Sequence, residues 1–487
     1  MLRATHFAPF LLSLTALLGQ AEKEHRFARE GVLGTSGNLV LAAPNAATAE
    51  RAAEAVFGAV AKFEAALSLW RDDSELAKLI AAGKGQASPT VSAILTVAEE
   101  WQTRSGGAIA PGVAKATELW RKAQQSGFAP EAAALREAAA NAAAVPWHRT
   151  GDQVEFSGPL TLDAFAKGWI VDRAILAVAD VPGVKLLSFQ IGGDLRAGAE
   201  SRHVAIVDPR EPADNGKPLA TVAVRDAAVA SSGGYARPFE VGVRKHSHVI
   251  DPRTGQPCDD VLGASVVAAD TATADALSTA LCVLGPEQGL KLLASIPGAE
   301  GVLVTRDGKV HRSKGFAELC VAEEPAAEAA GAWPNGFDVE VTFDIKAPDQ
   351  SGGGRRGGWK RPYVAVWVED ATGLPARTLC LWMENSRWLR DLRRWSRQHQ
   401  NEPGFADAIS QATRKAGHYT LRWDGKDDQG RVLAPGEYTI YIEAAREHGT
   451  YQIAKATLQL GTKKQTVKLD DNTELAGMTI DFGKHGK

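Results

Sequence analysis

The residues most suited to chemistry in this chain are an aspartate and a threonine four positions apart, Asp275 and Thr279. They lie in an alanine-rich stretch that is predicted to form a helix, with Asp270 as its N-cap and Gly285 at its end. Residues four apart lie on one face of a helix, one turn from each other. A carboxylate and a hydroxyl in this arrangement suit Mg²⁺, which keeps positions open for phosphate oxygens. The same pair is also common at an exposed helix edge, so the spacing alone does not establish a metal site.

Two polar segments precede this helix and add to the pattern. Residues 231–234, with the sequence SSGG, follow an apolar run and are predicted to form a turn whose backbone N–H groups can approach a ligand. Residues 248–255, with the sequence HVIDPRTG, end a short alternating strand in a polar turn. Taken alone, Ser232 is typical of a turn and His248 of a strand end, so it is the order of the three segments that is informative.

The three segments together resemble the ApbE family of FAD:protein FMN transferases. Members have a T-S-G turn, a HxIDPRTG segment and an ADALATAL helix. The corresponding letters here are SSG at 231–233, HVIDPRTG at 248–255 and ADALSTAL at 274–281. The resemblance covers residues 28–321 and implies an α+β fold, in which this part is a mixed α/β, T-fold-like transferase module.

The segment LTLDAFAKGWIVDRA, residues 160–174, resembles the family's LDLGGIAKGYAVDRA. The resemblance implies that the backbone carbonyl of Ala164 binds Mg²⁺ together with Asp275 and Thr279. It also implies that Lys167 lies near the FAD pyrophosphate, where a point cation stabilises phosphate charge. Asp163 and Ala164 replace the family's glycine pair, and Asp163 is predicted to cap a helix over residues 167–176.

The resemblance also implies which residues contact FAD. The turn after a predicted buried strand at 188–191 matches the family's nucleotide-binding turn. Trp70 stands where members have an aromatic that stacks on the flavin, although its type fits a core cap equally well. Leu33, Ile80 and Ala110 replace the family's Met, Asn and Asp. The residues expected at FAD are Gly34, Thr35, Trp70, Lys167, Gly192, Gly193, Asp194, Ser231, Ser232, Gly233 and His248.

The activity that the resemblance implies is an Mg²⁺-dependent transfer of FMN. A Thr or Ser hydroxyl of a partner redox protein attacks the FMN-side phosphorus of FAD, and AMP leaves. Catalysis is assigned to Lys167 and to His248 or Asp251 as the base or orienting group. Two alternatives stay open: an Mg²⁺-dependent FAD pyrophosphatase that uses water, and a flavin-binding or docking protein without turnover. The chain has no D-G-x-T-G-A-T-like acceptor segment, so self-modification is not expected.

The elements that position these residues follow from hydrophobic periodicity. Alternation predicts strands over residues 30–42 and 154–162. Helical spacing predicts helices over 47–67 and 91–104, and an alanine- and glutamate-rich composition predicts an exposed helix over 130–144.

Composition and the N-terminus limit the possible partners and location. The net charge of -3 over 487 residues argues against a general nucleic-acid binder. Residues 1–21 have a positive start, a short apolar run and small residues at the end, which is typical of a cleaved signal peptide and predicts a periplasmic protein without a transmembrane segment. The four cysteines show no metal-binding spacing, and whether Cys258 and Cys282 pair is left open.

The last third of the chain has a different pattern. Residues 322–335 are an acidic linker rich in alanine and proline, and residues 336–487 read as strands and turns that predict an all-β, sandwich-like domain. Helices are expected only over residues 388–396 and 405–415. The block resembles hook-cap Ig-like repeats and a periplasmic domain of unknown function found with ApbE proteins. Arginine and tryptophan are frequent over 351–397, a pattern that can bind nucleic acid, but in a secreted chain with a slightly acidic total we expect a solvated or protein-docking face.

Overall fold

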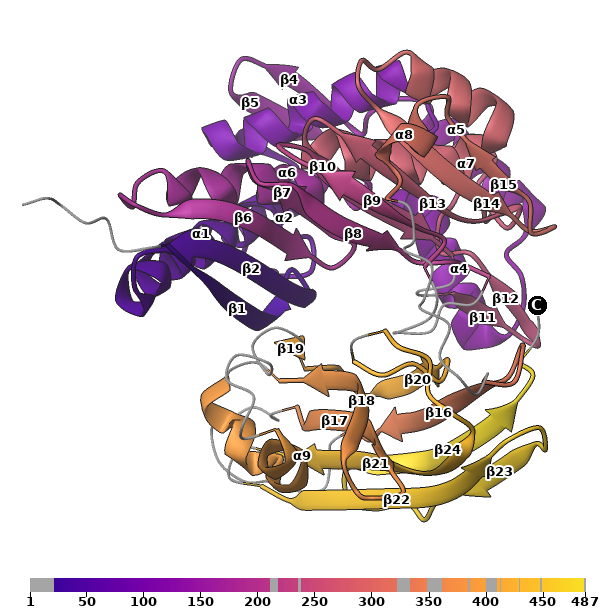
Figure 1. Cartoon of the computed structure of the whole chain (residues 1–487). Coiled ribbons are helices and arrows are strands. Elements are labelled where there is room, and N and C mark those ends of the chain that lie inside the picture. The colour runs from indigo at the N-terminus through magenta and orange to yellow at the C-terminus, as the bar shows by residue number, and fades with distance from the viewer. Residues whose placement is uncertain are drawn as a thin grey trace, which may run out of the picture.

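The computed structural model has two parts, a mixed α/β part at the N-terminal side and a β-rich part at the C-terminal side (Figure 1). The expected signal peptide lies outside the described residues, as does most of the expected linker. No helix in the described part of the chain is both long and apolar enough to cross a bilayer. The described residues are 22–210, 218–234, 238–321, 333–347, 361–383, 386–399, 410–411, 413–428, 430–446 and 449–485.

An eight-stranded antiparallel sheet forms the centre of the first part, in the order β1-β2-β6-β7-β10-β13-β14-β15. Neighbours that are far apart in the sequence, such as β2 and β6, bring separate motifs to one surface. The strands are β1 (Lys23–Val32), β2 (Thr35–Ala43), β6 (Lys185–Ile191), β7 (Asp194–Ala197), β10 (Ala228–Gly233), β13 (Val261–Ala268), β14 (Glu300–Thr305) and β15 (Val310–Arg312).

Helices pack on one face of this sheet and bury the larger core. Leu277 and Leu281 of α7 and Val56 of α1 meet Phe189 of β6 there. Of the helices, α1 (Ala46–Leu67), α2 (Glu75–Ala82), α3 (Pro89–Arg104), α6 (Ala166–Ala174) and α7 (Thr271–Ala294) contribute to this core; α4 (Ala114–Ser126) and α5 (Ala132–Ala142) form a separate cluster with β11, and α8 (Phe316–Leu319) packs with β8 and β9; the 3₁₀ turns are η1 (Pro111–Val113) and η2 (Ile175–Val178).

Small sheets complete the first part. One has three strands, β3 (Lys84–Gln86), β5 (Gln153–Phe156) and β4 (Trp147–Thr150). Two others are strand pairs: β8 (Arg202–Ile206) with β9 (Ala220–Val224), and β11 (Phe239–Val241) with β12 (Arg244–His246). The β8–β9 pair packs on the second face of the large sheet, where Val222 and Ile206 meet Val229 and Val302.

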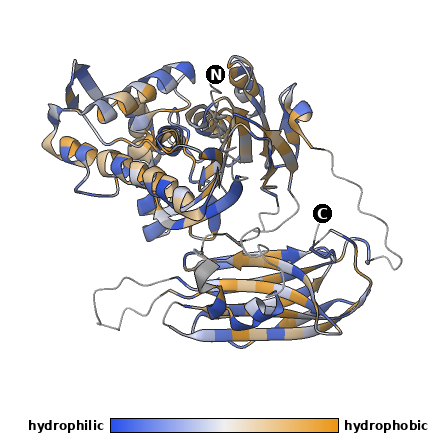
Figure 2. Ribbon diagram, turned by 60° about the vertical axis from the view of Figure 1, so that its left-hand side comes forward, coloured by the Kyte–Doolittle hydropathy of each residue, from blue (hydrophilic) through white to orange (hydrophobic). Residues whose placement is uncertain are grey.

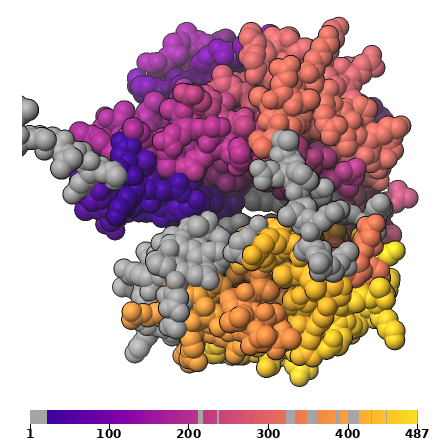
Figure 3. Space-filling view, in the orientation of Figure 1, coloured from indigo at the N-terminus to yellow at the C-terminus, as the bar shows by residue number. Residues whose placement is uncertain are grey.

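The C-terminal part is a sandwich of two sheets around its own core, as predicted. Figure 2 shows hydrophobic and hydrophilic residues in turn along its strands, and β16 alternates between half-buried and buried positions throughout. Figure 3 shows the two parts as separate packed masses. One sheet has the order β20 (Gly417–Trp423), β16 (Asp338–Ile345), β24 (Leu475–Gly483), β23 (Gln465–Lys468); the other has β19 (Ser410–Gln411), β18 (Pro375–Trp382), β17 (Tyr363–Asp370), β21 (Gly436–Ala445), β22 (Tyr451–Leu460).

Most predicted helices are confirmed. The structure has α1 over the predicted 47–67, α3 over 91–104 and α5 within 130–144, although α5 buries Leu135 and Ala138 instead of being fully exposed. The segment predicted over 388–396 forms the 3₁₀ turn η3 (Ser386–Asp391) and α9 (Arg393–Gln398). The helix predicted over 405–415 is wrong where it is described, because residues 410–411 form strand β19.

Three local predictions in the first part are wrong. Residues 30–42 form two strands, because Leu33 and Gly34 adopt positive φ angles of 49° and 76° and turn the chain between β1 and β2. The strand predicted over 154–162 ends at Phe156. Asp163 does not cap α6, whose N-cap is Phe165 without a side-chain hydrogen bond.

His485 ties the end of the C-terminal part to its first sheet and predicts a pH-dependent stability. Its ring contacts Asp338 of β16 and Asp481 of β24. Burial lowers the pKa of His485, but the hydrogen bonds that its ring donates to the two carboxylates outweigh burial and raise this pKa above its usual value. The stabilisation is therefore complete below the pKa of the unfolded chain and is lost as the pH rises through the higher folded pKa.

We expect His485→Gln to lower the thermal midpoint of the C-terminal part by roughly 2–4 °C at about pH 6 and by much less at about pH 9. Tryptophan fluorescence during a thermal melt measures this. The control is His418→Gln, which removes an exposed pair with Asp344 and should change little at either pH. An equal loss at both pH values for His485→Gln would contradict the charge argument.

Candidate functional site

The site is built on a close contact between the first turn of α6 and the N-terminus of α7. A Cβ atom on Gly168 would lie 2.3 Å from the carbonyl oxygen of Thr271, so only glycine fits at this position. One turn further along α6, Asp172 accepts hydrogen bonds from the N–H groups of Thr271 and Ala272, each at 2.9 Å. Asp270 caps α7 as predicted, accepting from the Thr273 N–H at 2.8 Å. The two helices are therefore held together at their N-terminal turns.

This contact places Asp275 over the N-terminus of α6. Asp275 is 2% exposed, and its Oδ2 accepts a hydrogen bond from the Gly168 N–H at 3.1 Å. Gly168 is the third residue of α6, so its N–H has no carbonyl partner inside that helix. The carbonyl of Ala164, four residues back, does not receive this N–H either. Asp275 thus caps α6, and the Ala164 carbonyl is not tied into the helix.

Lys167 joins two carboxylates from different elements. Its Nζ contacts Oδ2 of Asp194, the first residue of β7, and lies 3.7 Å from Oδ2 of Asp275. Asp194 is fully buried, and its Oδ1 has no hydrogen-bond partner among the described residues. Lys167 itself keeps 35% of its side chain exposed. The three charged groups therefore form one compact cluster with a single cation.

Burial and charge change the pKa values of this cluster in definite directions. Burial lowers the pKa of Lys167, but the charges of Asp194 and Asp275 outweigh it and raise this pKa above its usual value. Burial raises the pKa of Asp275, the nearby Asp194 charge raises it further, and Lys167 only partly offsets both. Lys167 is therefore a permanent cation, and Asp275 is a carboxylate whose charge needs a cation beside it.

Strand β10 directs the side chains of Ser231 and Ser232, both predicted to contact FAD, toward different partners. The predicted turn at 231–234 is wrong, because Ser231, Ser232 and Gly233 pair with β13 and only Gly234 lies in a turn. Ser232 Oγ lies 2.8 Å from Ser278 Oγ and 3.0 Å from Thr279 Oγ1, on the side of α7. Ser231 Oγ lies 2.7 Å from Ser265 Oγ instead. The Ser232 hydroxyl therefore contacts α7 beside Thr279, whereas the Ser231 hydroxyl contacts Ser265 of β13.

The turn between β6 and β7 lies beside the start of β2. The Gly192 N–H donates to the Ser36 carbonyl at 3.0 Å, and a Cβ on Gly192 would lie 3.2 Å from Thr35 Cγ2. Gly193 faces the backbone of Ser231, whose carbonyl oxygen would be 3.1 Å from a Cβ there. Backbone of β2, of the β6–β7 turn and of β10 therefore converges next to Asp194.

One neighbour of this region was not found from the sequence. Lys415 of the C-terminal part donates a hydrogen bond to the carbonyl of Gly34, in the turn before Thr35. The two residues are 381 positions apart, and no local pattern connects them.

The predicted base segment packs beside the end of β10. A Cβ on Gly234 would lie 2.8 Å from Ser247 Oγ, immediately before the half-buried His248. Asp251 uses both carboxylate oxygens to bind the Arg253 guanidinium, each at 2.8 Å. Asp251 therefore orders its own turn, and His248 is the better candidate for proton transfer.

Trp70 does not cap the core, so that alternative is wrong. Its side chain is 74% exposed, and the Arg121 guanidinium lies 4.9 Å from the ring centre. An exposed ring of this kind has a face available for stacking.

Cys258 and Cys282 are free thiols, and the Cys282 thiol donates to the Ser232 carbonyl at 3.5 Å.

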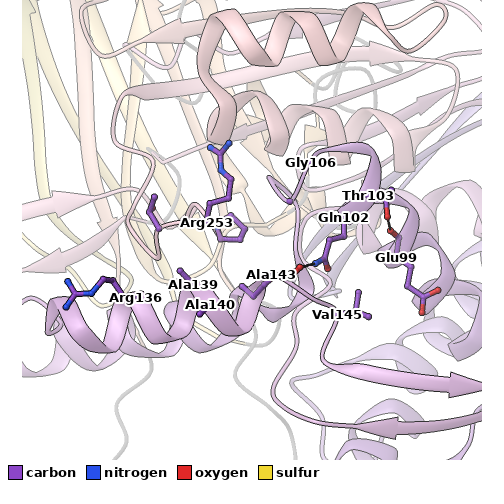
Figure 4. A pocket seen from close by; sticks show the side chains of 14 residues that line it. Glu99, Gln102, Thr103, Gly106, Arg136, Ala139, Ala140, Ala143, Val145 and Arg253 are labelled. Carbon is purple, nitrogen blue, oxygen red and sulfur yellow. Dashed lines mark hydrogen bonds between the residues drawn. The ribbon is translucent and has the colours of Figure 1, made fainter.

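Figure 4 shows a cavity of about 800 Å³ that is lined by no residue of the cluster. It is formed by α3, α5 and the turn after His248, with Gln102, Arg136 and Arg253 among its lining residues. None of the residues predicted to bind FAD or metal lines it.

Within the described part of the chain there is no group of three or more His, Cys, Asp or Glu residues that could hold a metal. A cation at the cluster would therefore need hydroxyl and carbonyl oxygens as well as a carboxylate.

Comparison with known proteins agrees with this arrangement. Residues 33–303 match the profile of the ApbE family, and residues 350–476 match a family described as "Predicted periplasmic protein (DUF2271)". A FAD:protein FMN transferase of Treponema pallidum is 35% identical in an alignment of 327 positions that covers 62% of this chain and 90% of that protein. One from Rhodobacter capsulatus is 32% identical, over 47% of this chain and 46% of that protein.

Solved structures agree on the fold. An ApbE protein of Thermotoga maritima matches with a TM-score of 0.54 and 24% identity, covering 62% of this chain and all of that protein. The flavinyl transferase ApbE of Pseudomonas stutzeri matches with a TM-score of 0.52 and 25% identity, covering 62% and 99%.

The helix contact at Gly168 predicts a large effect of a single methyl group. We expect Gly168→Ala to force α6 away from α7 and to destabilise the N-terminal part by about 1–3 kcal/mol, as overpacking usually does. Urea unfolding measures the loss. The matched control is Gly58→Ala in α1, where nothing lies within 4 Å of the new Cβ, and which should stabilise by up to about 1 kcal/mol. Equal stability of the two variants would contradict the proposed contact.

Proposed function

Because this chain belongs to the ApbE family, we propose that it transfers FMN from FAD to a Thr or Ser hydroxyl of a partner redox protein, with release of AMP. One observation carries the proposal. Three motifs that lie far apart in the sequence meet on α7: Lys167 Nζ lies 3.7 Å from Asp275 Oδ2, and Ser232 Oγ lies 3.0 Å from Thr279 Oγ1, one turn further along.

Mg²⁺ is proposed to bind at Asp275, Thr279 and the Ala164 carbonyl. These three groups offer only oxygen atoms, which this hard cation prefers. Two observations support the fit. The Gly168 N–H donates to Asp275 and not to the Ala164 carbonyl, so this carbonyl is available to a cation. The carboxylate of Asp275 is buried, and its charge needs a cation nearby. When bound, Mg²⁺ neutralises charge on the pyrophosphate oxygens and makes the phosphorus easier to attack.

The proposed reaction exchanges one phosphorus–oxygen bond for another. The acceptor hydroxyl oxygen bonds to the FMN-side phosphorus, and the bond from this phosphorus to the bridging oxygen breaks. The electron pair leaves with AMP, while the hydroxyl proton passes to the imidazole of His248. Lys167 stabilises the phosphate charge as a point cation, and Asp251 orients the His248 segment through Arg253.

FAD binding is proposed to use backbone more than side chains. The Gly192-Gly193 turn, with Gly34 and Thr35 beside it, presents backbone without side chains to the nucleotide, although the Gly192 N–H is itself bound to the Ser36 carbonyl. Trp70 is proposed to stack on the flavin, supported by its exposed ring. Of the remaining predicted contacts, Ser232 and Gly233 are proposed to act from β10, and Ser231 through its backbone.

The acceptor is proposed to be a flavoprotein of a periplasmic or membrane redox chain. The support is the match of residues 350–476 to a predicted periplasmic family, together with the signal-like residues 1–21. On this basis residues 28–321 are the transferase module, 322–335 the linker and 336–487 an accessory domain.

The role of Asp275 gives the direct test. We expect Asp275→Asn to reduce FMN attachment by about a hundredfold or more, because a bound metal supplies several kcal/mol of transition-state stabilisation. Mass spectrometry of candidate secreted redox proteins, incubated with FAD and Mg²⁺, measures one added FMN per acceptor. Chelation of Mg²⁺ should have the same effect on the wild type. The control is Asp180→Asn, an exposed aspartate away from the cluster.

The alternatives give different products in the same assay. Free FMN and AMP from FAD without an acceptor would identify a pyrophosphatase. Tight FAD binding without any product under Mg²⁺ would identify a docking protein. Full transfer by Asp275→Asn would rule out the metal assignment.

A further inference from the structure

Asp194 does not fit a role as a direct flavin contact. Its side chain, directly after the Gly192-Gly193 turn, is fully buried, so it has no surface that a bound ligand could touch in this arrangement. Its Oδ2 is bound to the Lys167 ammonium, and its Oδ1 has no hydrogen-bond partner among the described residues. A buried carboxylate with one unpartnered oxygen is costly, so its retention calls for a specific role.

The ammonium of Lys167 lies where a cation is needed by two carboxylates at once. It contacts Asp194 and lies 3.7 Å from Asp275, the proposed metal ligand. Asp163, four residues before Lys167, is exposed, and its negative charge raises the pKa of both Lys167 and Asp275 slightly further. Without Lys167 the group would carry only negative charge in a partly buried setting.

We propose that Lys167 serves as a built-in substitute for the metal ion in the FAD-free protein, and that Asp194 is the positioning residue that holds it there. The inference rests on the proposed Mg²⁺ site at Asp275. The ammonium compensates Asp275 until a divalent cation binds, and it therefore competes with that cation electrostatically. When the cation takes Asp275, Asp194 keeps Lys167 in the cluster, so the lysine is retained beside the pyrophosphate site instead of swinging into solvent.

The proposal makes the two single substitutions act in opposite directions. Lys167→Met removes the competing positive charge, so the FAD-free protein should bind a divalent cation more tightly. Asp194→Asn removes a buried negative charge and leaves Asp275 as the remaining partner of the ammonium, so binding should weaken although Asp194 is not a ligand. In the double variant Lys167→Met/Asp194→Asn the net charge of the cluster equals that of the wild type, so the affinity should return.

The experiment measures Mn²⁺ binding to the full chain, freed of FAD, by electron paramagnetic resonance and calorimetry at one fixed pH. We expect Kd to fall roughly tenfold for Lys167→Met and to rise roughly tenfold for Asp194→Asn, the scale of one partly screened charge within a few ångströms. The double variant should lie within about threefold of the wild type, because charges are then balanced. Lys167→Arg keeps the charge and should also match the wild type, and it serves as the control for packing.

The outcomes separate this inference from the function on which it rests. If the wild type does not bind Mn²⁺, or Asp275→Asn binds it equally well, the proposed metal site fails and the inference with it. If Asp275→Asn loses binding but Lys167→Met is unchanged or weaker, only the inference is overturned. If the double variant stays as weak as Asp194→Asn, Asp194 is itself a metal ligand, and the positioning role is wrong. If Lys167→Met unfolds, the double and Lys167→Arg variants still decide, because both have to match the wild type.

Discussion

The close contact between α6 and α7 is the constraint on which the rest of the site depends. At Gly168 the backbone of one helix meets the backbone of the other at a distance that excludes any side chain. That approach allows Asp172 to bind two N–H groups of α7 and Asp275 to bind one of α6. Each carboxylate meets the positive end of the opposite helix, where a negative charge is favourable. The helices thus cap each other, and the hydrogen bond from the Gly168 N–H also fixes the carboxylate of Asp275, the proposed metal ligand.

Electrostatics explains why a lysine accompanies the two carboxylates of the cluster, Asp194 and Asp275. Two buried carboxylates, Asp194 and Asp275, repel each other and are poorly solvated, which the raised pKa of Asp275 reflects. Lys167 is the cation that makes this arrangement tolerable. At the proposed Mg²⁺ site, the negative charge of the carboxylates is therefore already partly compensated by Lys167.

Sequence reasoning predicted the parts of the site that depend on local signals. The cap at Asp270 and the break at Gly285, whose φ of 70° interrupts α7, follow from residue types within a few positions. It failed where tertiary pairing decides. Small residues at 231–234 favour a turn, but pairing with β13 keeps Ser231 to Gly233 extended and sends the two hydroxyls to different partners. The bond from Lys167 to Asp194 joins an α6 residue to a strand end, and no spacing rule predicts it.

The φ angles at the positions that depart from the family's motifs show which substitutions strain the backbone. Asp163 and Ala164 replace a glycine pair, yet neither has a positive φ angle, so the lost glycine freedom causes no strain before α6. Leu33 does have a positive φ of 49°, and a side chain there costs about 1 kcal/mol relative to glycine. Its turn also receives the bond from Lys415 to Gly34, so the C-terminal part contacts the site region where the backbone is strained. The departure beside the proposed metal ligands, at Asp163 and Ala164, is therefore free of positive-φ strain, whereas the departure at Leu33 carries it.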